Sequence, residues 1–277
     1  PGEPVPQGSG RTCCERPSPA QTDELNDMRL DGKVAVVTGA ASGFGRGIAE
    51  LFAAEGAKIV VADINATAAG DLGEKLGKDR AIAMATDVTR RADVDAMIAS
   101  AVEVFGGVDI LVNNAGVTHK NQSLMHVSED EFDRIYAVNV KSIYLTTLAV
   151  VPVMEKRGGG SIINTASTAG IRPRPGLTWY NGSKGAAITL TKSMAAELAP
   201  KNIRVNAINP VIGETGMLEQ FMGLPDTPEN RAKFVAGIPL GRMSKPLDIA
   251  NAALFLADPA SAFITGVAIE VDGGRCI

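Results

Sequence analysis

Short apolar runs alternate with longer stretches of helical period along the chain from residue 34 onward. The short runs predict strands at 34–38, 58–63, 81–86, 110–113, 161–165, 204–209 and 268–271. The longer stretches predict helices at 45–55, 91–105, 128–155, 179–198 and 246–257, and Gly56 is placed to end the first of them. This alternation is typical of an α/β fold in which seven mainly parallel strands form a doubly wound sheet with helices on both faces.

The length and composition suit one large domain: of 277 residues, 45% are hydrophobic and 21% are charged. We expect this domain to span 28–277, with a lid over a site in the Gly- and Pro-punctuated segment 211–240. Residues 1–27 lack an apolar period, so we expect a disordered extension or an artefact of start-site choice. An organelle leader is the alternative, and the acidic residues in this segment disfavour it.

The charge and cysteine content exclude several classes of partner. A net charge of -4 creates no general field for nucleic acid or anionic lipid, so a small-molecule partner is expected. We find neither an apolar run as long as a membrane span nor the apolar core of a secretion signal. Cys13, Cys14 and Cys276 have neither a disulfide-framework spacing nor a metal-ligand spacing, and His119 and His126 add no metal cluster. We therefore expect a soluble, cytoplasmic protein without a metal.

A glycine-rich turn, Thr-Gly-Ala-Ala-Ser-Gly-Phe-Gly, connects the first predicted strand to the first predicted helix. Glycines at such a turn let backbone N–H groups approach a pyrophosphate, and the helix N-terminus favours its negative charge. A tight turn that binds no ligand is the alternative. The candidate cofactor contacts in this turn are Gly39, Ser42, Gly43, Phe44 and Gly45.

An acidic residue, Asp63, ends the second predicted strand at the edge of the sheet where ligands bind. Its carboxylate can accept hydrogen bonds from both ribose hydroxyls and would repel a 2′-phosphate. No arginine directly follows it to receive a phosphate. The sequence therefore predicts NAD rather than NADP, with a solvated strand-end carboxylate as the alternative.

Tyr180 and Lys184 stand one helical turn apart on the same face of a predicted helix. Taken alone, such a pair is often a surface feature. Ser167, just after the fifth predicted strand, and Asn139, within the predicted helix 128–155, add two further polar groups. A free phenol titrates near 10, and a neighbouring ammonium favours the phenolate, so the pair is suited to proton transfer at an oxygen atom.

The T-G-x-x-x-G-x-G turn and the order and spacing of Asn139, Ser167, Tyr180 and Lys184 resemble the short-chain dehydrogenase/reductase family over about residues 30–274. The resemblance implies a Rossmann-type fold and hydride transfer between NAD and a secondary alcohol or polyol and its ketone. It implies that Tyr180 is the general acid/base and that Ser167 holds the substrate oxygen. It also implies that Lys184 binds the nicotinamide ribose and that Asn139 anchors a water linked to Lys184.

The same resemblance implies further cofactor contacts along the chain. Asp87 and Val88 would contact the adenine, and the turn after the fourth strand would line the cofactor. The family usually has Gly where this chain has Val211, which puts the local backbone path in question. The further residues implied are Asp87, Val88, Asn114, Ala115, Gly116, Pro210 and Thr215, with Tyr180 and Lys184 contacting both cofactor and substrate.

Two alternative functions remain open. A 3-oxoacyl thioester reductase of the same family, acting on an acyl carrier protein or acyl-CoA substrate, shares the four catalytic residue types. Asp63 argues against it, because biosynthetic reductions usually use NADPH. A catalytically dormant nucleotide-binding scaffold is the alternative from another class.

Several other side chains could edge a substrate pocket or a subunit contact. Arg172 and Arg174 could meet an anionic or polyhydroxylated substrate, with plain surface charge as an equal alternative. Trp179 could form a pocket wall or a subunit contact. The segment His119, Lys120 and Asn121 could edge the pocket or be a solvated loop, and Ile143, Tyr144 and Leu148 favour a homodimer or homotetramer, as in the family.

Overall fold

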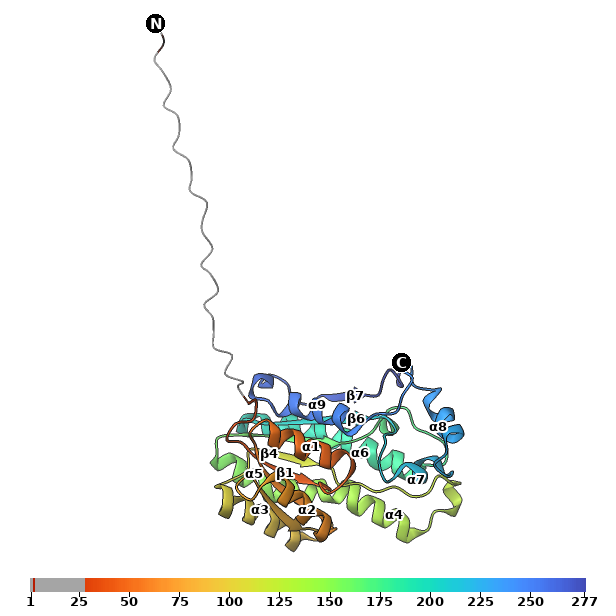
Figure 1. Cartoon of the computed structure of the whole chain (residues 1–277), viewed down its shortest axis with the longest axis horizontal. Helices are drawn as coiled ribbons and strands as arrows, with labels where there is room; N and C mark the ends of the chain where they lie inside the picture. The colour runs from red at the N-terminus through yellow and green to blue at the C-terminus, as the bar shows by residue number, and fades with distance from the viewer. Residues whose placement is uncertain (1, 3–27) are drawn as a thin grey trace.

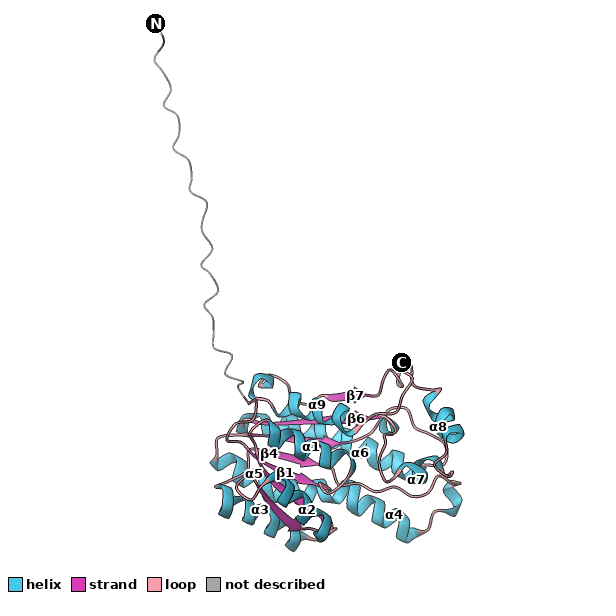
Figure 2. Ribbon diagram, in the orientation of Figure 1, coloured by secondary structure: helices cyan, strands magenta, loops and turns pink. Residues whose placement is uncertain are grey.

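One parallel sheet forms the middle layer of the domain. The computed structural model describes residue 2 and residues 28–277, so the expected extension at 1–27 lies outside the described residues apart from Gly2. Within this part, seven strands pair in the order β3-β2-β1-β4-β5-β6-β7, and all neighbours are parallel (Figure 2). They are β1 (Val34–Thr38), β2 (Lys58–Asp63), β3 (Ala81–Ala85), β4 (Ile110–Asn113), β5 (Gly160–Thr165), β6 (Ile203–Pro210) and β7 (Ala268–Val271).

Helices cover both faces of the sheet (Figure 1). Phe52 and Leu254 belong to the apolar cluster on one face, and Met97 and Leu198 belong to the cluster on the other. The predicted two-sided burial of the strands is therefore confirmed. The helices are α1 (Gly43–Ala54), α2 (Ala66–Leu76), α3 (Arg91–Phe105), α4 (Glu129–Tyr136), α5 (Ser142–Lys156), α6 (Thr178–Leu198), α7 (Leu218–Met222), α8 (Pro228–Val235) and α9 (Pro246–Ala257).

Helix α2 is absent from the sequence prediction. Gly70 and Gly73 are poor helix formers and obscure its pattern. The side chain of Asn65 accepts a hydrogen bond from Ala68 N and caps the helix. A Cβ atom at Gly73 would lie 3.3 Å from the Cβ of Ala83, so the glycine lets α2 pack closely on β3.

The predicted helix 128–155 is divided into α4, a π-helical turn at Ala137–Lys141, and α5. Ser128 and Glu131 form a capping box at its start. Asn139 sits inside the widened turn, where its side chain leaves the helix to bond elsewhere. π-helical turns of this kind occur frequently at functional sites.

The helical stretch Glu129–Lys156 is long and apolar enough to cross a membrane, with a mean hydropathy of 1.5 over an 18-residue window, contrary to our expectation that no segment would qualify. Val150 and Met154 nevertheless belong to the apolar cluster of the domain. The hydroxyl of Thr146 donates to Asn113 Oδ1 at 2.8 Å and ties the helix to β4. Tyr144 and Leu148 stay exposed, whereas Ile143 of the same prediction is buried in the core, so it is not available for a subunit contact.

From β1 the chain adds β2 and β3 toward one edge of the sheet, and from β4 it adds β5, β6 and β7 toward the opposite edge. This change of direction places a crevice at the carboxyl ends of β1 and β4. The predicted lid at 211–240 lies beyond these strand ends and contains α7 and α8, so much of it is helical (Figure 1). Val211 is buried and its N–H donates to Val271 O at 3.3 Å. The backbone there has no positive φ, so valine in place of the family's usual glycine is accommodated.

Candidate active site

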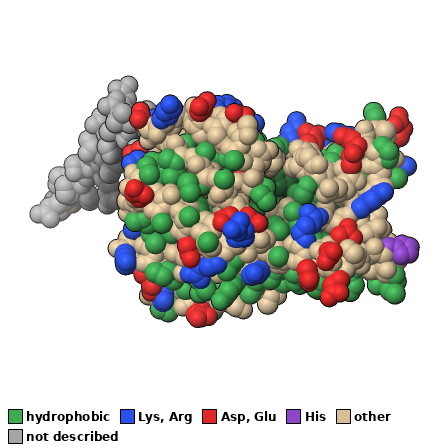
Figure 3. Space-filling view, turned by 90° about the horizontal axis from the view of Figure 1, so that it is seen from below, with side chains coloured by type: hydrophobic (Ala, Val, Ile, Leu, Met, Phe, Trp, Pro, Cys, Tyr) green, Lys and Arg blue, Asp and Glu red, His purple; other side chains and the backbone are tan. Residues whose placement is uncertain are grey.

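A cavity of about 500 Å³ lies at the carboxyl edge of the sheet. Seen from below, the molecule is hollowed between its main body and the lobe at the right, with hydrophobic side chains in the hollow (Figure 3). Two predicted residues, Gly45 and Asn139, lie outside its lining. The other predicted residues that line it are Gly39, Ser42, Gly43, Phe44, Asp63, Asp87, Val88, Asn114, Ala115, Gly116, Ser167, Tyr180, Lys184, Pro210 and Thr215.

The glycine turn brings bare backbone to the cavity. Gly39 and Gly43 have positive φ values of 62° and 54°, which glycine adopts readily. A Cβ atom at Gly39 would lie 2.9 Å from Ala115 Cα, and one at Gly45 would lie 2.1 Å from Gly39 O. Gly45 therefore serves the packing of α1 on the turn. Ser42 makes no side-chain capping bond among the described residues, which leaves the first N–H groups of α1 for an anion.

Asn114 joins the turn after β4 to the turn after β1. Its Nδ2 donates to Thr38 O at 3.0 Å and to Gly39 O at 3.1 Å. In return, Thr38 Oγ1 accepts from Asn114 N at 3.0 Å and from Ala115 N at 3.1 Å. These reciprocal bonds hold both turns in one position at the crevice.

Asp63 and Asp87 are the carboxylates among the residues that line the cavity. Asp63 Oδ2 accepts from Ala41 N at 3.0 Å, and Oδ1 accepts from Asn65 N at 2.9 Å. Each carboxylate oxygen has a further lone pair, so Asp63 can still accept from ribose hydroxyls. Asp87 Oδ1 accepts from the N–H and the hydroxyl of Thr89.

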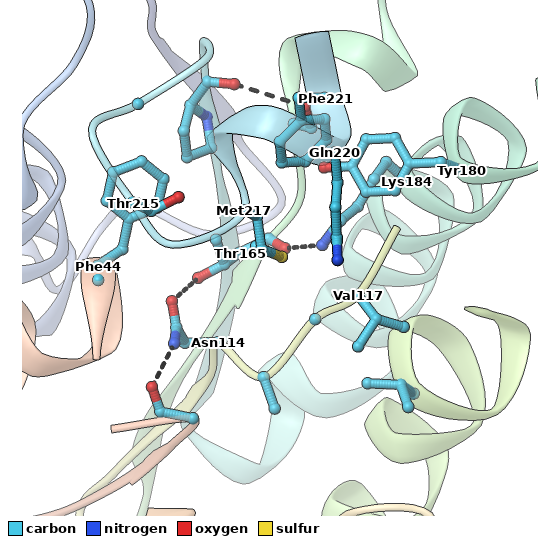
Figure 4. A pocket seen from close by; sticks show the side chains of 18 of the residues that line it. Phe44, Asn114, Val117, Thr165, Tyr180, Lys184, Thr215, Met217, Gln220 and Phe221 are labelled. Carbon is cyan, nitrogen blue, oxygen red and sulfur yellow. Dashed lines mark hydrogen bonds between the residues drawn. The ribbon is translucent and has the colours of Figure 1, made fainter. Parts of the chain in front are cut away.

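Ser167, Tyr180 and Lys184 converge at the other end of the cavity. Ser167 follows β5 and shares a hydrogen bond with Tyr180. The Lys184 ammonium donates to Thr165 O at 2.8 Å and lies 5.8 Å from the centroid of the Tyr180 ring. Tyr180 and Lys184 lie together on α6, facing the end of β5 (Figure 4). The three side chains predicted from sequence are therefore close together.

Burial sets the protonation of this group. It raises the pKa of Tyr180 to about 12, and the hydrogen bond with Ser167 lowers that pKa only in part. It also lowers the pKa of Lys184 to about 8. Near pH 7 the lysine is therefore mostly cationic and the phenol neutral. A phenol in this state carries a proton, but its raised pKa makes it a weak acid, and it needs positive charge nearby to release that proton or to act as a base.

Asn139 lies behind the cavity and orients its surroundings. Its Nδ2 donates to Val117 O at 2.9 Å and to Ser183 Oγ at 3.0 Å, and its Oδ1 accepts from Val117 N at 2.9 Å. A Cβ atom at Gly116 would lie 3.3 Å from Lys184 Nζ and 3.5 Å from Asn139 Oδ1. Because Gly116 has no side chain, a space remains between Lys184 Nζ and Asn139 Oδ1. The water that we expect at Asn139 stays a prediction.

Comparison with known proteins agrees with this geometry. Residues 39–275 match the family profile described as enoyl-(acyl carrier protein) reductase. The chain is 50% identical over 252 residues to 4-formylbenzenesulfonate dehydrogenase of Comamonas testosteroni, covering 90% of this chain and 100% of the relative. The chain belongs to the short-chain dehydrogenase/reductase family. It is therefore an oxidoreductase, as predicted.

Other members of the short-chain dehydrogenase/reductase family show a spread of named activities. A 3-oxoacyl-(acyl-carrier-protein) reductase of Thermotoga maritima is 41% identical, covering 90% of this chain and 100% of the relative. A 7alpha-hydroxysteroid dehydrogenase of Escherichia coli K12 is 40% identical, covering 90% and 96%. The crystal structure of a 3-ketoacyl-(acyl-carrier-protein) reductase from Brucella melitensis, complexed with NADH, has a TM-score of 0.84 and 49% identity and covers 90% of this chain and 100% of that chain.

The substrate end of the cavity contains residues that the sequence did not reveal. Phe221 of α7 stands edge-on to Tyr180, with ring centroids 5.1 Å apart (Figure 4). The predicted lid pointed to this segment, but no short-chain dehydrogenase/reductase motif marks the individual side chains. The unpredicted lining residues of this end include Val117, Arg134, Val138, Leu177, Met217, Gln220 and Phe221.

The structure separates the other candidates. Arg174 lines the cavity, whereas Arg172 is exposed and donates to Arg275 O at 2.5 Å. His119 is buried outside the lining, with Nδ1 2.8 Å from Lys120 O, and Lys120 is exposed outside the lining, so neither His119 nor Lys120 edges the pocket. Trp179 packs edge-on against the ring of Phe132 and donates to Leu124 O at 3.3 Å. Asn121 Nδ2 bonds to the carbonyls of Pro175 and Phe221 and joins the lid to the pocket rim.

Proposed function

We propose that this oxidoreductase interconverts a secondary alcohol or polyol and its ketone with NAD as the hydride carrier. The observation that carries the proposal is the convergence of Ser167, Tyr180 and Lys184 in a cavity that begins at a glycine-rich phosphate turn. The oxidation removes a proton from the alcohol oxygen and a hydride from its carbon, and reduction is the reverse. Bound NAD supplies the hydride acceptor or donor.

The residues of the cavity fit this cofactor. The first turn of α1 and the bare backbone of Gly39 and Gly43 suit its pyrophosphate. Asp63 would bind the adenosine ribose and disfavour a 2′-phosphate, so we propose NAD over NADP. Lys184 would hold the nicotinamide ribose and Thr215 the carboxamide. The NADH named in the Brucella melitensis structure supports this assignment.

The catalytic side chains have different roles in the proposed reaction. Tyr180 takes the proton from the alcohol oxygen in oxidation and returns it in reduction. Lys184, cationic near pH 7, together with the positive ring of bound NAD, would favour the phenolate of Tyr180. The Ser167 hydroxyl holds the substrate oxygen beside the phenol. Asn139 keeps Val117 and Ser183 in place around them.

A 3-oxoacyl thioester reductase is the second candidate, because the Thermotoga maritima and Brucella melitensis relatives carry that name. Asp63 favours the first candidate through its preference for NAD. A catalytically dormant scaffold is disfavoured by the complete set of catalytic residue types. Soluble cytoplasmic localisation and assembly into a homodimer or homotetramer through the exposed Tyr144 and Leu148 complete the proposal.

A substrate panel tests the proposal. Secondary alcohols, polyols, their ketones and acetoacetyl-CoA would each be assayed with NAD(H) and NADP(H) by absorbance of the reduced nicotinamide. We expect turnover of alcohols or ketones with NAD(H), at least tenfold more efficient than with NADP(H). Preferred turnover of the thioester with NADPH would establish the second candidate. Absence of turnover with every pair would support the dormant scaffold.

A further inference from the structure

The cavity is charged differently at its two ends. The carboxylates that line it, Asp63 and Asp87, follow β2 and β3. The guanidinium groups that line it belong to Arg134 of α4 and to Arg174, in the loop between β5 and α6. Arg134 is exposed, and its Nη2 donates to Thr118 O at 3.2 Å.

Arg174 is a half-buried cation without a counter-ion among the described residues. Its Cζ lies 5.1 Å from the centroid of the Phe234 ring on α8. Burial, and then the charge of Arg275, lower the pKa of its guanidinium. Most other arginines in residues 28–277 form an ion pair with a carboxylate, but Arg174 forms neither an ion pair nor a side-chain hydrogen bond there. Withdrawing a cation from water without a partner is costly, and an anion bound beside it offsets that cost.

The backbone of Arg174 is held next to the catalytic helix. Its carbonyl accepts from Asn181 Nδ2 at 2.8 Å, and Asn181 directly follows Tyr180. Arg172, two residues earlier, is turned to the C-terminal segment, where it donates to Arg275 O. The two arginines that sequence alone left equivalent are therefore placed differently, and only Arg174 of the two faces the cavity.

Apolar side chains of the cavity surround Tyr180. Ala169, Leu177 and Phe221 pack with the Tyr180 ring in one cluster and line the same cavity. A ligand that joins the two polar ends must therefore carry its reacting oxygen at one end, an apolar body in the middle and a negative charge at the other end.

We infer that the substrate is a small alcohol or ketone with an apolar body and a carboxylate or sulfonate group, which Arg174 binds. This inference rests on the proposed function and narrows its substrate class. Arginine binds such oxyanions through paired, charge-assisted hydrogen bonds, so it both adds affinity and orients the substrate. The ring of Phe234 from α8 holds the guanidinium in place and connects substrate binding to the lid.

The first test compares matched substrates. The probes are α-methylbenzyl alcohol with a para-carboxylate, the methyl ester of that acid, and the para-sulfonate, each assayed with NAD. We expect kcat/KM for at least one anionic probe to exceed that for the ester by about tenfold or more. The carboxylate and the sulfonate arms identify which oxyanion is preferred. An ester that is turned over as well as both anions would overturn the inference and leave the proposed function intact.

The second test changes the arginine. Arg174→Met keeps an unbranched apolar stem but removes the guanidinium charge, and we expect the anion-to-ester ratio of kcat/KM to fall about 10- to 100-fold, mainly through KM. Arg174→Lys should restore part of the ratio, because it retains a point charge. The matched control, Arg172→Met, should leave the ratio unchanged. An equal fall in Arg172→Met and Arg174→Met would contradict the inference.

A binding measurement separates this inference from the proposed function. Titration calorimetry with para-acetylbenzoate and its methyl ester, on protein saturated with NAD, requires no turnover. Tighter binding of the acid that depends on Arg174 would uphold the anion site even if no alcohol is oxidised. Equal binding of acid and ester, or preferred turnover of acetoacetyl-CoA that is insensitive to Arg174→Met, would reject it.

Discussion

The two ends of the cavity are built in different ways. At the end formed by β1, β2 and β4, backbone turns and short side chains such as Asn114 and Asp63 bond to one another through the main chain. At the other end, Tyr180 and Lys184 are buried on α6, and the wall opposite them comes from the lid. The first end suits a cofactor that many enzymes share. The second end combines the catalytic side chains of α6 with a wall whose side chains can differ between enzymes.

This difference explains how one family can act on different substrates. The named relatives include an aromatic sulfonate dehydrogenase, a steroid dehydrogenase and thioester reductases, all at 40% identity or more. We expect binding energy for the cofactor to come from the strand ends, and substrate selection to come from side chains of α7 and of the loop before α6, which line the cavity. Substitutions at the two ends should therefore have separable effects.

The largest expected effect is at the catalytic end, from Tyr180→Phe. Removal of the hydroxyl takes away the group that moves the proton, so kcat should fall about 10²- to 10⁴-fold. Binding of NADH, followed by its fluorescence, should change little, since the Asn114 and Asp63 contacts remain. A variant that keeps more than a tenth of the turnover would contradict the proposed mechanism. A parallel loss of NADH binding would break the separation of the two ends.

The next effect is a shift of the pH profile in Lys184→Met. Oxidation needs the phenolate of Tyr180, and burial raises the pKa of that phenol to about 12. The Lys184 ammonium, present below its own pKa of about 8, stabilises the phenolate. Without it the phenolate is less stabilised, so kcat for oxidation should fall by about tenfold or more near pH 7 and by less above pH 8, where the wild-type ammonium is also lost. An equal loss of kcat at every pH would show that Lys184 acts only in binding.

A substitution at the cofactor end should have a smaller effect, which is confined to the choice between NAD and NADP. Asp63→Ala removes the carboxylate that would repel a 2′-phosphate, so the ratio of kcat/KM with NAD to that with NADP should fall by about tenfold or more. The control is Asp71→Ala, an exposed carboxylate on α2, which should leave the ratio unchanged. An unaltered ratio in Asp63→Ala would remove the argument for NAD specificity.

The positions of the glycine turn and of Tyr180 and Lys184 at one cavity could be predicted from sequence, because each depends on local structure. A glycine turn between strand and helix, or Tyr180 and Lys184 one turn apart, brings its residues together within a few positions of chain. The seven strands followed from their apolar runs for the same reason. Helix α2 was not predicted, because Gly70 and Gly73 weaken its helical pattern. Gly73 is explained only by the packing of α2 on β3.

The substrate end could not be predicted residue by residue. Phe221 meets Tyr180, and Phe234 meets Arg174, through contacts between segments far apart in the chain. No periodic pattern encodes such contacts, because they depend on how the lid folds over the strand ends. Arg172 and Arg174 look alike in sequence, and only the path of the loop decides which one faces the cavity.

The smallest expected effect on catalysis comes from Asn139→Ala. Asn139 lies behind the cavity, where its two ends meet. The substitution removes bonds to Val117 and Ser183 and leaves their polar groups without these partners, so the free energy of unfolding should fall by roughly 1–3 kcal/mol. Because Val117 lines the substrate end and Ser183 precedes Lys184, kcat should fall severalfold while KM for NAD changes less. Thr147→Val, which removes bonds from the Thr147 hydroxyl to Ile143 O and Met194 Sδ, is the matched control for stability. A loss of stability with unchanged kcat would make Asn139 a purely structural residue, and an equal rise in KM for NAD would show that the two ends share a support.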